Sequence, residues 1–508
     1  MDISLKHEDY KYLKAYKDST VEEALEYEII LPEYMPEILR IVKTDACVQV
    51  HSCKASENKA IAEGVCSIRM TYTGEDNCLY TFEVLKPFAR TLENNAFTDS
   101  ADVIASSRVT YVNCKATSTR NAHVKTGIII DFVAYASCNE DIISTSEEMN
   151  IEEKKMSVDT LSLGCRKTRS FSLSDNVALE KPGCFIVSVL PCAILTETRK
   201  INNKIMIKGD AIAEVCYVLS ADKMQTETIR HIIPINQIME FDGMEEHMYG
   251  DVALCVTATD VSVKGEAGGS FSGFDISLGI DVSVTMWEEK TVHPIIDAYA
   301  IGAAIELEKE NYVFYDSPCV LNENYIFESS FSVAGEGVKQ ILNKSYKITD
   351  VYVKSDNGVI IICGNLSLSL VIRDNGNSLS CVNKSLEFSF THKNDKYNKN
   401  CSLTPTINIA SLSCHVKGEN AIDIRAEMKL CGTVICERSV EVVKAIKESD
   451  KPFVCNGCAI TVYFPQKSNE SLWSIARRYN TTVKAIAEEN LLEGDTTENL
   501  KMIFIPSA

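Results

Sequence analysis

Four cysteines near the C-terminus have the residue type and number that a tetrahedral zinc site requires. Cys431 and Cys436 come first, and Cys455 and Cys458 follow with an Asn-Gly pair between them. Thiolate sulfur is a common ligand of structural zinc. The spacing is irregular, however, Cys431 lies within an alternating strand pattern, and Asn-Gly is a strong hairpin signal. We therefore interpret Cys455 and Cys458 as thiols that flank a turn, and we predict no metal site.

The rest of the sequence contains no catalytic constellation. Its eight histidines form neither HExxH nor a Cys/His zinc spacing, and neither GxSxG nor a P-loop occurs. The glycine-rich stretch at residues 265–273 opens no helix, so it lacks the helix N-terminus of a phosphate cradle, and we interpret it as a hairpin loop. The sequence predicts no enzymatic activity, no catalytic residues and no cofactor. A hydrolase whose site follows no motif is the weaker alternative.

Charge and cysteine usage restrict the partners and the compartment. The 508-residue chain has a net charge of −20, which argues against nucleic acid or an anionic membrane surface as the main partner. The N-terminus has no apolar run typical of a signal peptide, and no run of about 20 apolar residues is present. Many of the 20 cysteines lie within apolar runs. We predict a cytoplasmic protein whose cysteines are all reduced.

Most of the chain repeats one pattern three times. Each copy has an apolar strand, a glycine and then alternating apolar residues, and the glycines Gly64, Gly209 and Gly364 lie 145 and 155 residues apart. A glycine within a strand indicates a bulge or a close backbone approach. Period-2 alternation continues downstream in each copy and predicts antiparallel sheets with one wet and one dry face. We predict three β-rich units at residues 21–145, 158–300 and 301–446, with an acidic helix or linker at "SEEMNIEEKKMS" between the first two.

The period changes near the C-terminus. In "SLWSIARRYNTTVKAIAEEN", Ser471 can cap a helix whose apolar residues, Leu472, Ile475, Ala476 and Tyr479, follow helical spacing. A second short helix follows, and strands are predicted before and after the pair. The predicted order over residues 459–506 is strand, helix, helix, strand.

This tail resembles a LysM domain. The resemblance implies a shallow groove for N-acetylglucosamine-containing glycans, formed by the loop before the first helix and the loop after the second. The groove positions in this sequence are Asn469, Glu470, Ser471, Asn490, Leu491 and Leu492. The sequence departs from the LysM pattern because Asn469-Glu470-Ser471 replaces the usual Gly-Asp-Thr and the usual Pro-Gly-Gln before the last strand is missing.

The β-repeats, with "LPEYMPEILRIVKTDA" near the start of the first, resemble SPOCS domains of spore-coat proteins. SPOCS repeats followed by a terminal LysM domain resemble the SipL-like family of coat morphogenetic proteins. That resemblance implies a protein made in the mother cell and assembled on the forespore, as part of the spore coat. It also implies that the LysM domain binds SpoIVA, the ATPase of the coat's basement layer, and that the repeats contact other coat proteins.

Two function classes remain open at this stage. The first is a non-enzymatic assembly scaffold, for which Trp473, Val462 and Ile460 are the candidate partner-binding residues. Trp473 lies beside the apolar stripe of its helix, so it can be core or a half-exposed binding hot spot. The second class is a glycan-binding protein that uses the LysM groove for peptidoglycan sugars.

Overall fold

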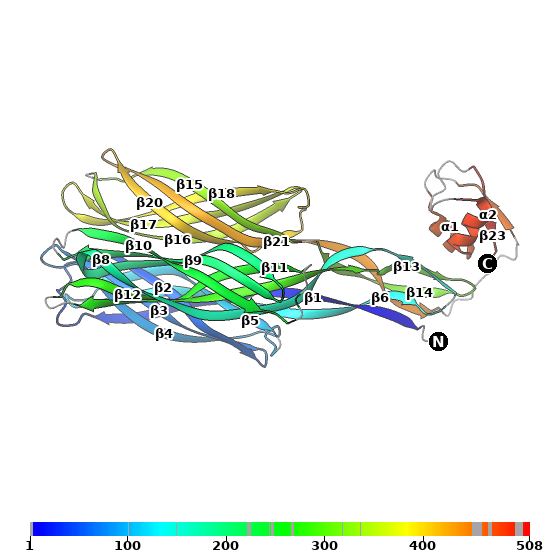
Figure 1. The fold of residues 1–508 in the computed structure, drawn as a ribbon, viewed down its shortest axis with the longest axis horizontal. Coiled ribbons are helices and arrows are strands. Elements are labelled where there is room, and N and C mark those ends of the chain that lie inside the picture. The colour runs from blue at the N-terminus through cyan, green and yellow to red at the C-terminus, as the bar shows by residue number, and fades with distance from the viewer. Residues whose placement is uncertain are drawn as a thin grey trace.

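The computed structural model describes residues 4–99, 101–148, 150–220, 225–242, 244, 248–265, 269–316, 318–335, 337–449, 460–465, 470–492 and 501–507. Three β-sandwiches lie together at one end, a slender stalk extends from them, and a small helical domain lies beyond the stalk (Figure 1). The predicted fold class is confirmed: the chain is mainly β and antiparallel, and its tail has the order strand, helix, helix, strand.

The first repeat is formed by β1 (Leu5–Ile30), β2 (Arg40–Ser56), β3 (Lys59–Thr73), β4 (Leu79–Glu93), β5 (Asp102–Ala116) and β6 (Asn121–Ser146). The second is formed by β8 (Val158–Ile201), β9 (Lys204–Leu219), β10 (Thr226–Glu240), β11 (Tyr249–Gly265) and β12 (Phe271–Val292). The third is formed by β14 (Ile305–Tyr315), β15 (Cys319–Ser332), β16 (Val338–Asp356), β17 (Val359–Asp374), β18 (Leu379–Lys393), β19 (Cys401–Leu403), β20 (Thr406–Lys417) and β21 (Ala421–Glu448).

Each repeat forms a sandwich because buried side chains alternate with more exposed ones along its strands. In β17, for example, buried positions alternate with half-buried ones along most of the strand. The first repeat packs the sheet β1-β6-β5 against the sheet β2-β3-β4 around one apolar core. The third repeat packs β16-β17-β18 against strands grouped around β21. In the second repeat the two halves share β8, whose 44 residues pair first with β12 and then with β9.

The three strand glycines occupy equivalent places, and the prediction of a bulge or close approach is confirmed. Gly64, Gly209 and Gly364 each lie opposite an irregularity in the neighbouring strand, where the register shifts. A Cβ atom on Gly64 or Gly364 would lie 2.6 Å from the ring of Phe88 or Phe388, respectively. Glycine is therefore required at these positions because the chain and a phenylalanine ring occupy the space of a side chain.

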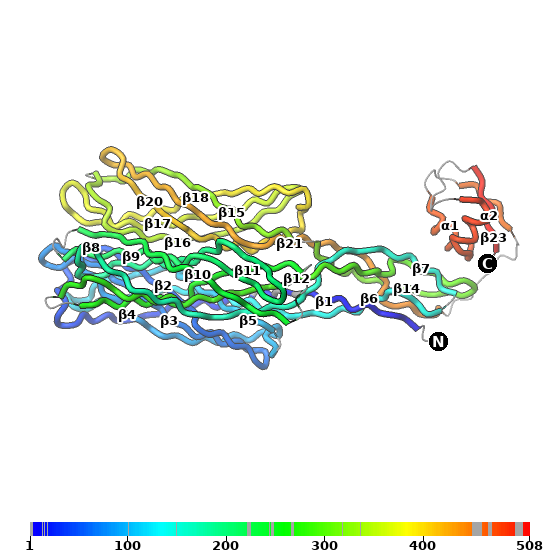
Figure 2. The backbone as a smooth tube through the Cα atoms, viewed as in Figure 1, coloured from blue at the N-terminus to red at the C-terminus, as the bar shows by residue number. Residues whose placement is uncertain are grey.

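The stalk is a structure to which all three repeats contribute (Figure 2). The first and last strands of each repeat extend beyond its sandwich as an antiparallel ribbon: β1 with β6, β8 with β12, and β14 with β21. One buried side chain from each of the six strands fills the stalk core: Tyr10, Ile142, Val158, Val292, Phe314 and Val442. Because the three ribbons cover one another, the stalk requires all three repeats.

Two predictions made from the sequence differ from the structure of the stalk. The segment predicted as an acidic helix or linker contains a strand, β7 (Ile151–Lys155), which pairs with β13 (Ile295–Ala300). That helix prediction is wrong because the segment finds a distant partner strand, which outweighs its local preference. In addition, β1 begins at Leu5, well before residue 21, where the first unit was predicted to start. No helix in the described part of the chain is long and apolar enough to cross a lipid bilayer.

Candidate functional site in the tail domain

The tail domain is a pair of short helices packed on a two-stranded sheet. The helices are α1 (Leu472–Tyr479) and α2 (Val483–Asn490), and the strands are β22 (Ile460–Tyr463) and β23 (Ile503–Pro506). The predicted cap of α1 is present, since Ser471 Oγ accepts a hydrogen bond from the Ser474 amide at 3.3 Å. Thr482 caps α2 in the same way. Each helix ends at a residue in the left-handed conformation, Asn480 and Leu491, respectively.

Trp473 faces the stalk rather than solvent. Its side chain is only 9% exposed, and its ring meets the ring of Tyr299 on β13 edge to face, with centroids 4.9 Å apart. Its indole Nε1 donates a hydrogen bond to Asp297 Oδ2 at 2.8 Å. The prediction of Trp473 as a half-exposed anchor does not match this placement, because β13, far away in sequence, supplies both an apolar and a polar partner.

Further polar contacts hold α1 against β13. Arg477 Nη1 donates to both carboxylate oxygens of Asp297, at 2.9 and 2.8 Å. Tyr299 donates its hydroxyl to the Thr481 carbonyl at 2.7 Å, and burial raises the pKa of this phenol well above its ordinary value. Asn480 bonds to the Ala300 carbonyl and accepts from the Gly302 amide, both at 2.8 Å. We call this set of contacts the stalk dock.

The opposite face of the tail domain is apolar and exposed. Along β22 and β23, Ile503 and Ile505 point toward the helices and are buried, so their neighbours point outward. Ile460 and Val462, two of the predicted partner-binding residues, lie on this outward side at 52% and 48% exposure. Val462 lies directly opposite Phe504.

Sequence reasoning missed three residues of this surface. Phe464, Met502 and Phe504 are 63%, 42% and 38% exposed and extend the patch on either side of the predicted pair. The alternation in "MIFIP" could have indicated two of them, because Met502 and Phe504 fall out of phase with the buried Ile503 and Ile505. We call Ile460, Val462, Phe464, Met502 and Phe504 the outer face.

Comparison with known protein families finds matches in the first repeat, the second repeat and the tail. Residues 37–117 and 186–264 match the family described as SipL, SPOCS domain, and residues 467–501 match the LysM domain. The chain therefore contains SPOCS-type repeats and a C-terminal LysM domain. No curated protein and no solved structure gives a significant match. The two SPOCS matches fall in the first and second repeats, at β2 to β5 and at the equivalent strands from β8 to β11.

The residues predicted for the LysM groove mostly bond within the domain. Asn490 is tied to β23, because its side chain donates to the Phe504 carbonyl at 2.6 Å and accepts from the Phe504 amide at 2.7 Å. Glu470 accepts from Tyr463 and from Arg478, both at 2.7 Å, and its hydrogen bond raises the pKa of Tyr463. Leu491 is 92% exposed, whereas Leu492 packs against the tail core. Asn469 lies outside the described residues.

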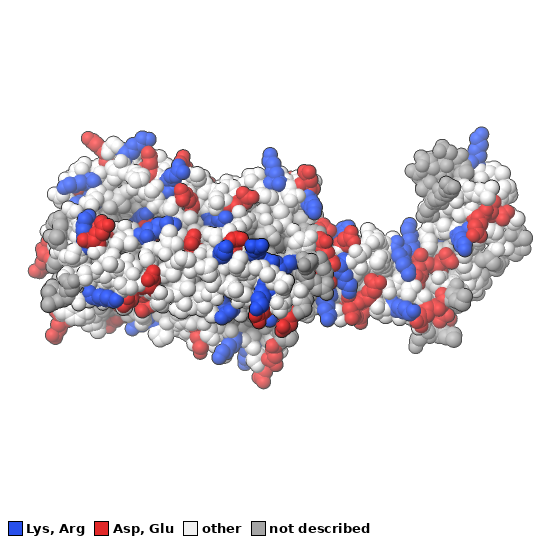
Figure 3. Space-filling model, viewed as in Figure 1, with Lys and Arg blue, Asp and Glu red and all other residues white. Residues whose placement is uncertain are grey.

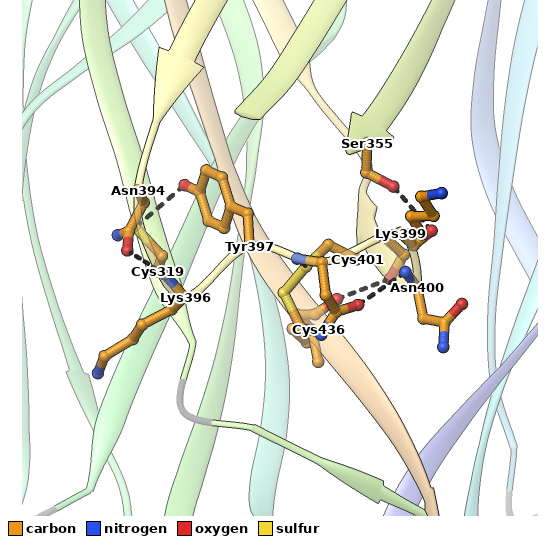
Figure 4. The surroundings of a disulfide bond; sticks show 12 residues. Cys319, Ser355, Asn394, Lys396, Tyr397, Lys399, Asn400, Cys401 and Cys436 are labelled. Carbon is orange, nitrogen blue, oxygen red and sulfur yellow. Dashed lines mark hydrogen bonds between the residues drawn. A yellow bond between two sulfur atoms is a disulfide. The ribbon is translucent and has the colours of Figure 1, made fainter. Parts of the chain in front are cut away.

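Two of the cysteines, one of them a candidate zinc ligand, form a disulfide. Cys401 on β19 lies directly opposite Cys436 on β21, and the two are bonded to each other (Figure 4). The prediction that all cysteines are reduced is therefore wrong at this pair, whose members lie 35 residues apart and meet only through strand pairing. The remaining cysteines of the described chain are free thiols. Cys455 and Cys458 lie outside the described residues, and Cys436 is already bonded.

Charges on one broad face of the molecule are mixed rather than concentrated. On the face shown in Figure 3, acidic and basic side chains are interspersed over the sandwiches, with no broad basic patch. Among the described residues no group of three or more His, Cys, Asp and Glu side chains has the arrangement of a metal site. The largest feature that offers binding chemistry in the described tail is therefore the outer face.

Proposed function

We propose that this SPOCS–LysM protein is a non-enzymatic assembly scaffold of the spore coat, made in the mother cell. Its LysM domain docks on the SpoIVA-type basement-layer ATPase at the forespore surface, and its repeats contact other coat proteins. The domain combination, which is that of a sporulation-related protein, supports the proposal. The observation that carries it is the outer face, whose five neighbouring side chains are apolar and 38–63% exposed.

An apolar patch of this kind favours a protein partner over a sugar. Association with a protein gains free energy from burial of apolar area, at roughly 25 cal/mol per Å². Sugars require donors and acceptors, and the outer face carries none on its side chains. Exposed apolar clusters on an otherwise mixed surface are typical of interaction sites. The partner surface should therefore be apolar at its centre.

The stalk dock also supports the outer face as the binding surface. Because Trp473, Arg477 and Asn480 hold α1 on β13, the opposite side of the domain faces away from the stalk. A scaffold needs its binding surface presented away from its own body. A docked tail also restricts the orientation of the partner relative to the three repeats, since the domain does not swing freely.

The decisive experiment compares variants of the full chain in a pull-down of the SpoIVA-type ATPase. Val462→Arg puts a charge at the centre of the outer face and should cost about 2–4 kcal/mol of binding free energy, as expected for a hot spot. Leu491→Ser is the matched control, because Leu491 is exposed in the same domain but lies at the groove. Full ATPase capture by the Val462→Arg variant, with the tail folded, would contradict the proposal.

Glycan binding is the alternative function, and the LysM match supports it. Titration with N-acetylglucosamine oligomers distinguishes glycan binding from the scaffold function. Binding of these oligomers that weakens in the Leu491→Ser variant, together with no capture of the ATPase by the native chain, would establish the glycan-binding class instead. We expect no saturable sugar binding, because Asn490 and Glu470 already use their polar atoms within the domain.

A further inference from the structure

Among the edge strands of the sheets, one in each repeat occupies an equivalent place, and the three repeats protect that edge differently. These strands are β4, β10 and β18, each paired with a single neighbour, β3, β9 and β17, respectively. An unpaired edge presents a row of main-chain donors and acceptors that can accept another strand. Proteins protect such edges with proline or with charged groups that cover the main chain.

The first two repeats carry proline at the same place on the edge. Pro87 of β4 lies one residue before the partner of Gly64, and Pro234 of β10 lies one residue before the partner of Gly209. The Gly74 amide donates to the Cys78 carbonyl, so even-numbered residues of β4 bond to β3 and Pro87 points its nitrogen outward. Proline there removes an outward donor without removing a bond of the sheet.

The second repeat protects its edge further. Arg169 Nη1 of β8 donates to the outward carbonyl of Ile238 at 3.2 Å, and Lys167 Nζ donates to that of Glu240 at 3.0 Å. Two main-chain acceptors of β10 are thereby occupied by side chains of its own repeat. The edge of the second repeat therefore has a proline in place of one donor and cations on two acceptors.

The third repeat lacks this protection along the second half of its edge strand, although Arg40 of the first repeat donates to the outward carbonyl of Leu379 near the start of β18. Glu387 occupies the position of Pro87 and Pro234, since it lies one residue before the partner of Gly364. The Asp374 amide donates to the Ser378 carbonyl, so odd-numbered residues of β18 point their main-chain groups outward, Glu387 included. In the described chain, β18 pairs with β17 alone, and no side chain bonds to its outward groups from Glu387 to Lys393.

A second position on the same edge also differs in charge between the third repeat and the first two. Six residues beyond each proline, the first two repeats have Glu93 and Glu240, which pair with Lys59 and Lys204 of the neighbouring strand. The third repeat has Lys393 there, opposite the apolar Val359. Lys393 and Glu387 are both exposed, and neither forms an ion pair within the described residues.

We propose that the edge of β18 pairs antiparallel with the same edge of a second copy of this chain. A two-fold axis at Phe390 places Glu387 of each copy directly opposite Lys393 of the other, and Ser389 opposite Thr391. All four residues are odd-numbered, so their outward main-chain groups meet as hydrogen-bonded pairs. The β16-β17-β18 sheets of two copies then join into one continuous sheet.

The charges on β18 favour a second copy of this chain as the partner of its edge. The chain as a whole carries −20, so most contacts between two copies bring like charges together. Over the paired segment, Glu387 and Lys393 complement each other twice because a two-fold axis duplicates every contact. Opposite charges directly across an antiparallel pair stabilise it. The facing side chains between them are small hydroxyls, which allow the strands to approach.

The test is the oligomeric state of the full chain by sedimentation velocity at increasing protein concentration. The native chain should shift from monomer to dimer. Glu387→Pro installs the residue that the first two repeats already have, and it should leave the chain monomeric at every concentration. Circular dichroism and the melting temperature of this variant should match the native values, because the replaced N–H points outward.

Charge reversal gives an independent readout. Glu387→Lys and Lys393→Glu should each abolish the dimer, since each places like charges opposite one another, and the double variant should restore it. A native chain that stays monomeric, or a dimer that survives Glu387→Pro, would overturn the proposal. Loss of the dimer in both single variants without recovery in the double variant would also overturn it. The inference does not depend on the LysM domain, and Val462→Arg should leave the dimer intact.

Discussion

The two faces of the LysM domain meet different surroundings although each has an aromatic residue near its centre. On the side of α1, Trp473 is 9% exposed and its polar atom bonds to Asp297 of the stalk. On the outer face, Phe504 is 38% exposed and its neighbours are equally apolar. One face is therefore occupied by the chain itself, and the other remains available. The comparison teaches that a tryptophan in a small domain can anchor that domain to its own protein.

The strongest test of this difference is Trp473→Ala. It removes a buried ring and should lower the free energy of unfolding of the tail domain by about 3–5 kcal/mol. Hydrogen exchange followed by mass spectrometry should show lost protection in α1 and α2 and unchanged protection in the sandwiches. Leu491→Ala, at a fully exposed site, is the control. Unchanged protection of α1 would mean that the indole is not part of the domain's core.

Asp297→Ala should have the next largest effect. It removes the acceptor shared by Trp473 and Arg477 and leaves the indole N–H without its partner. Hydrogen bonds to a charged group are worth about 1.5–3 kcal/mol, so the stalk dock should weaken by that amount. Small-angle scattering should detect a wider range of tail positions.

A double-mutant cycle makes the Asp297 prediction specific. Arg477→Ala should add little once Asp297 is replaced, because the two residues share one interaction. Strictly additive effects of the two substitutions would show that the carboxylate and the guanidinium act separately.

Tyr299→Phe should weaken the dock by about 1 kcal/mol, since it removes one hydroxyl that bonds to the Thr481 carbonyl. The same hydroxyl predicts a pH dependence. Burial raises the pKa of Tyr299 in the folded protein, so the contribution of its protonated form is complete below the ordinary phenol pKa of about 10 and is lost as the pH rises above it. Exposure of α1 should therefore increase in alkaline solution. The Phe variant should show a smaller increase, and an equal increase in both proteins would exclude Tyr299 as its source.

Local patterns in the sequence predicted the elements well and their distant partners poorly. Alternation in "VIIICGNLSLSLVIR" indicated a strand, and the strand glycines indicated close approach, because both depend on a few neighbouring residues. The helices of the tail and the Ser471 cap are equally local. These features require no knowledge of what the strand or helix packs against.

The missed features all involve residues that are far apart in sequence. The contact of Trp473 with Asp297 spans 176 residues, and the Cys401–Cys436 disulfide forms because β19 and β21 pair in one register. The strand at Ile151–Lys155 was missed because a short acidic segment has the local pattern of a linker. Its strand conformation depends on pairing with the distant β13. Register between distant strands depends on the whole fold, so one sequence gives little access to it.

The smallest expected effect on stability comes from the outer face. Phe504→Ser replaces a side chain that is 38% exposed and keeps the main chain of β23 paired with Val462, so the tail should lose no more than about 1 kcal/mol. The hydroxyl remains solvated, and the buried Ile503 and Ile505 on the other side of the strand are untouched. If the outer face binds the basement-layer ATPase, the same variant should lose capture of that partner while its thermal unfolding matches that of the native chain. Trp473→Ala should give the opposite order, with a large loss of stability and weakened capture only as a consequence of it. Native capture by the Phe504→Ser variant would leave the outer face without a partner, and it would move the docking surface away from this sheet.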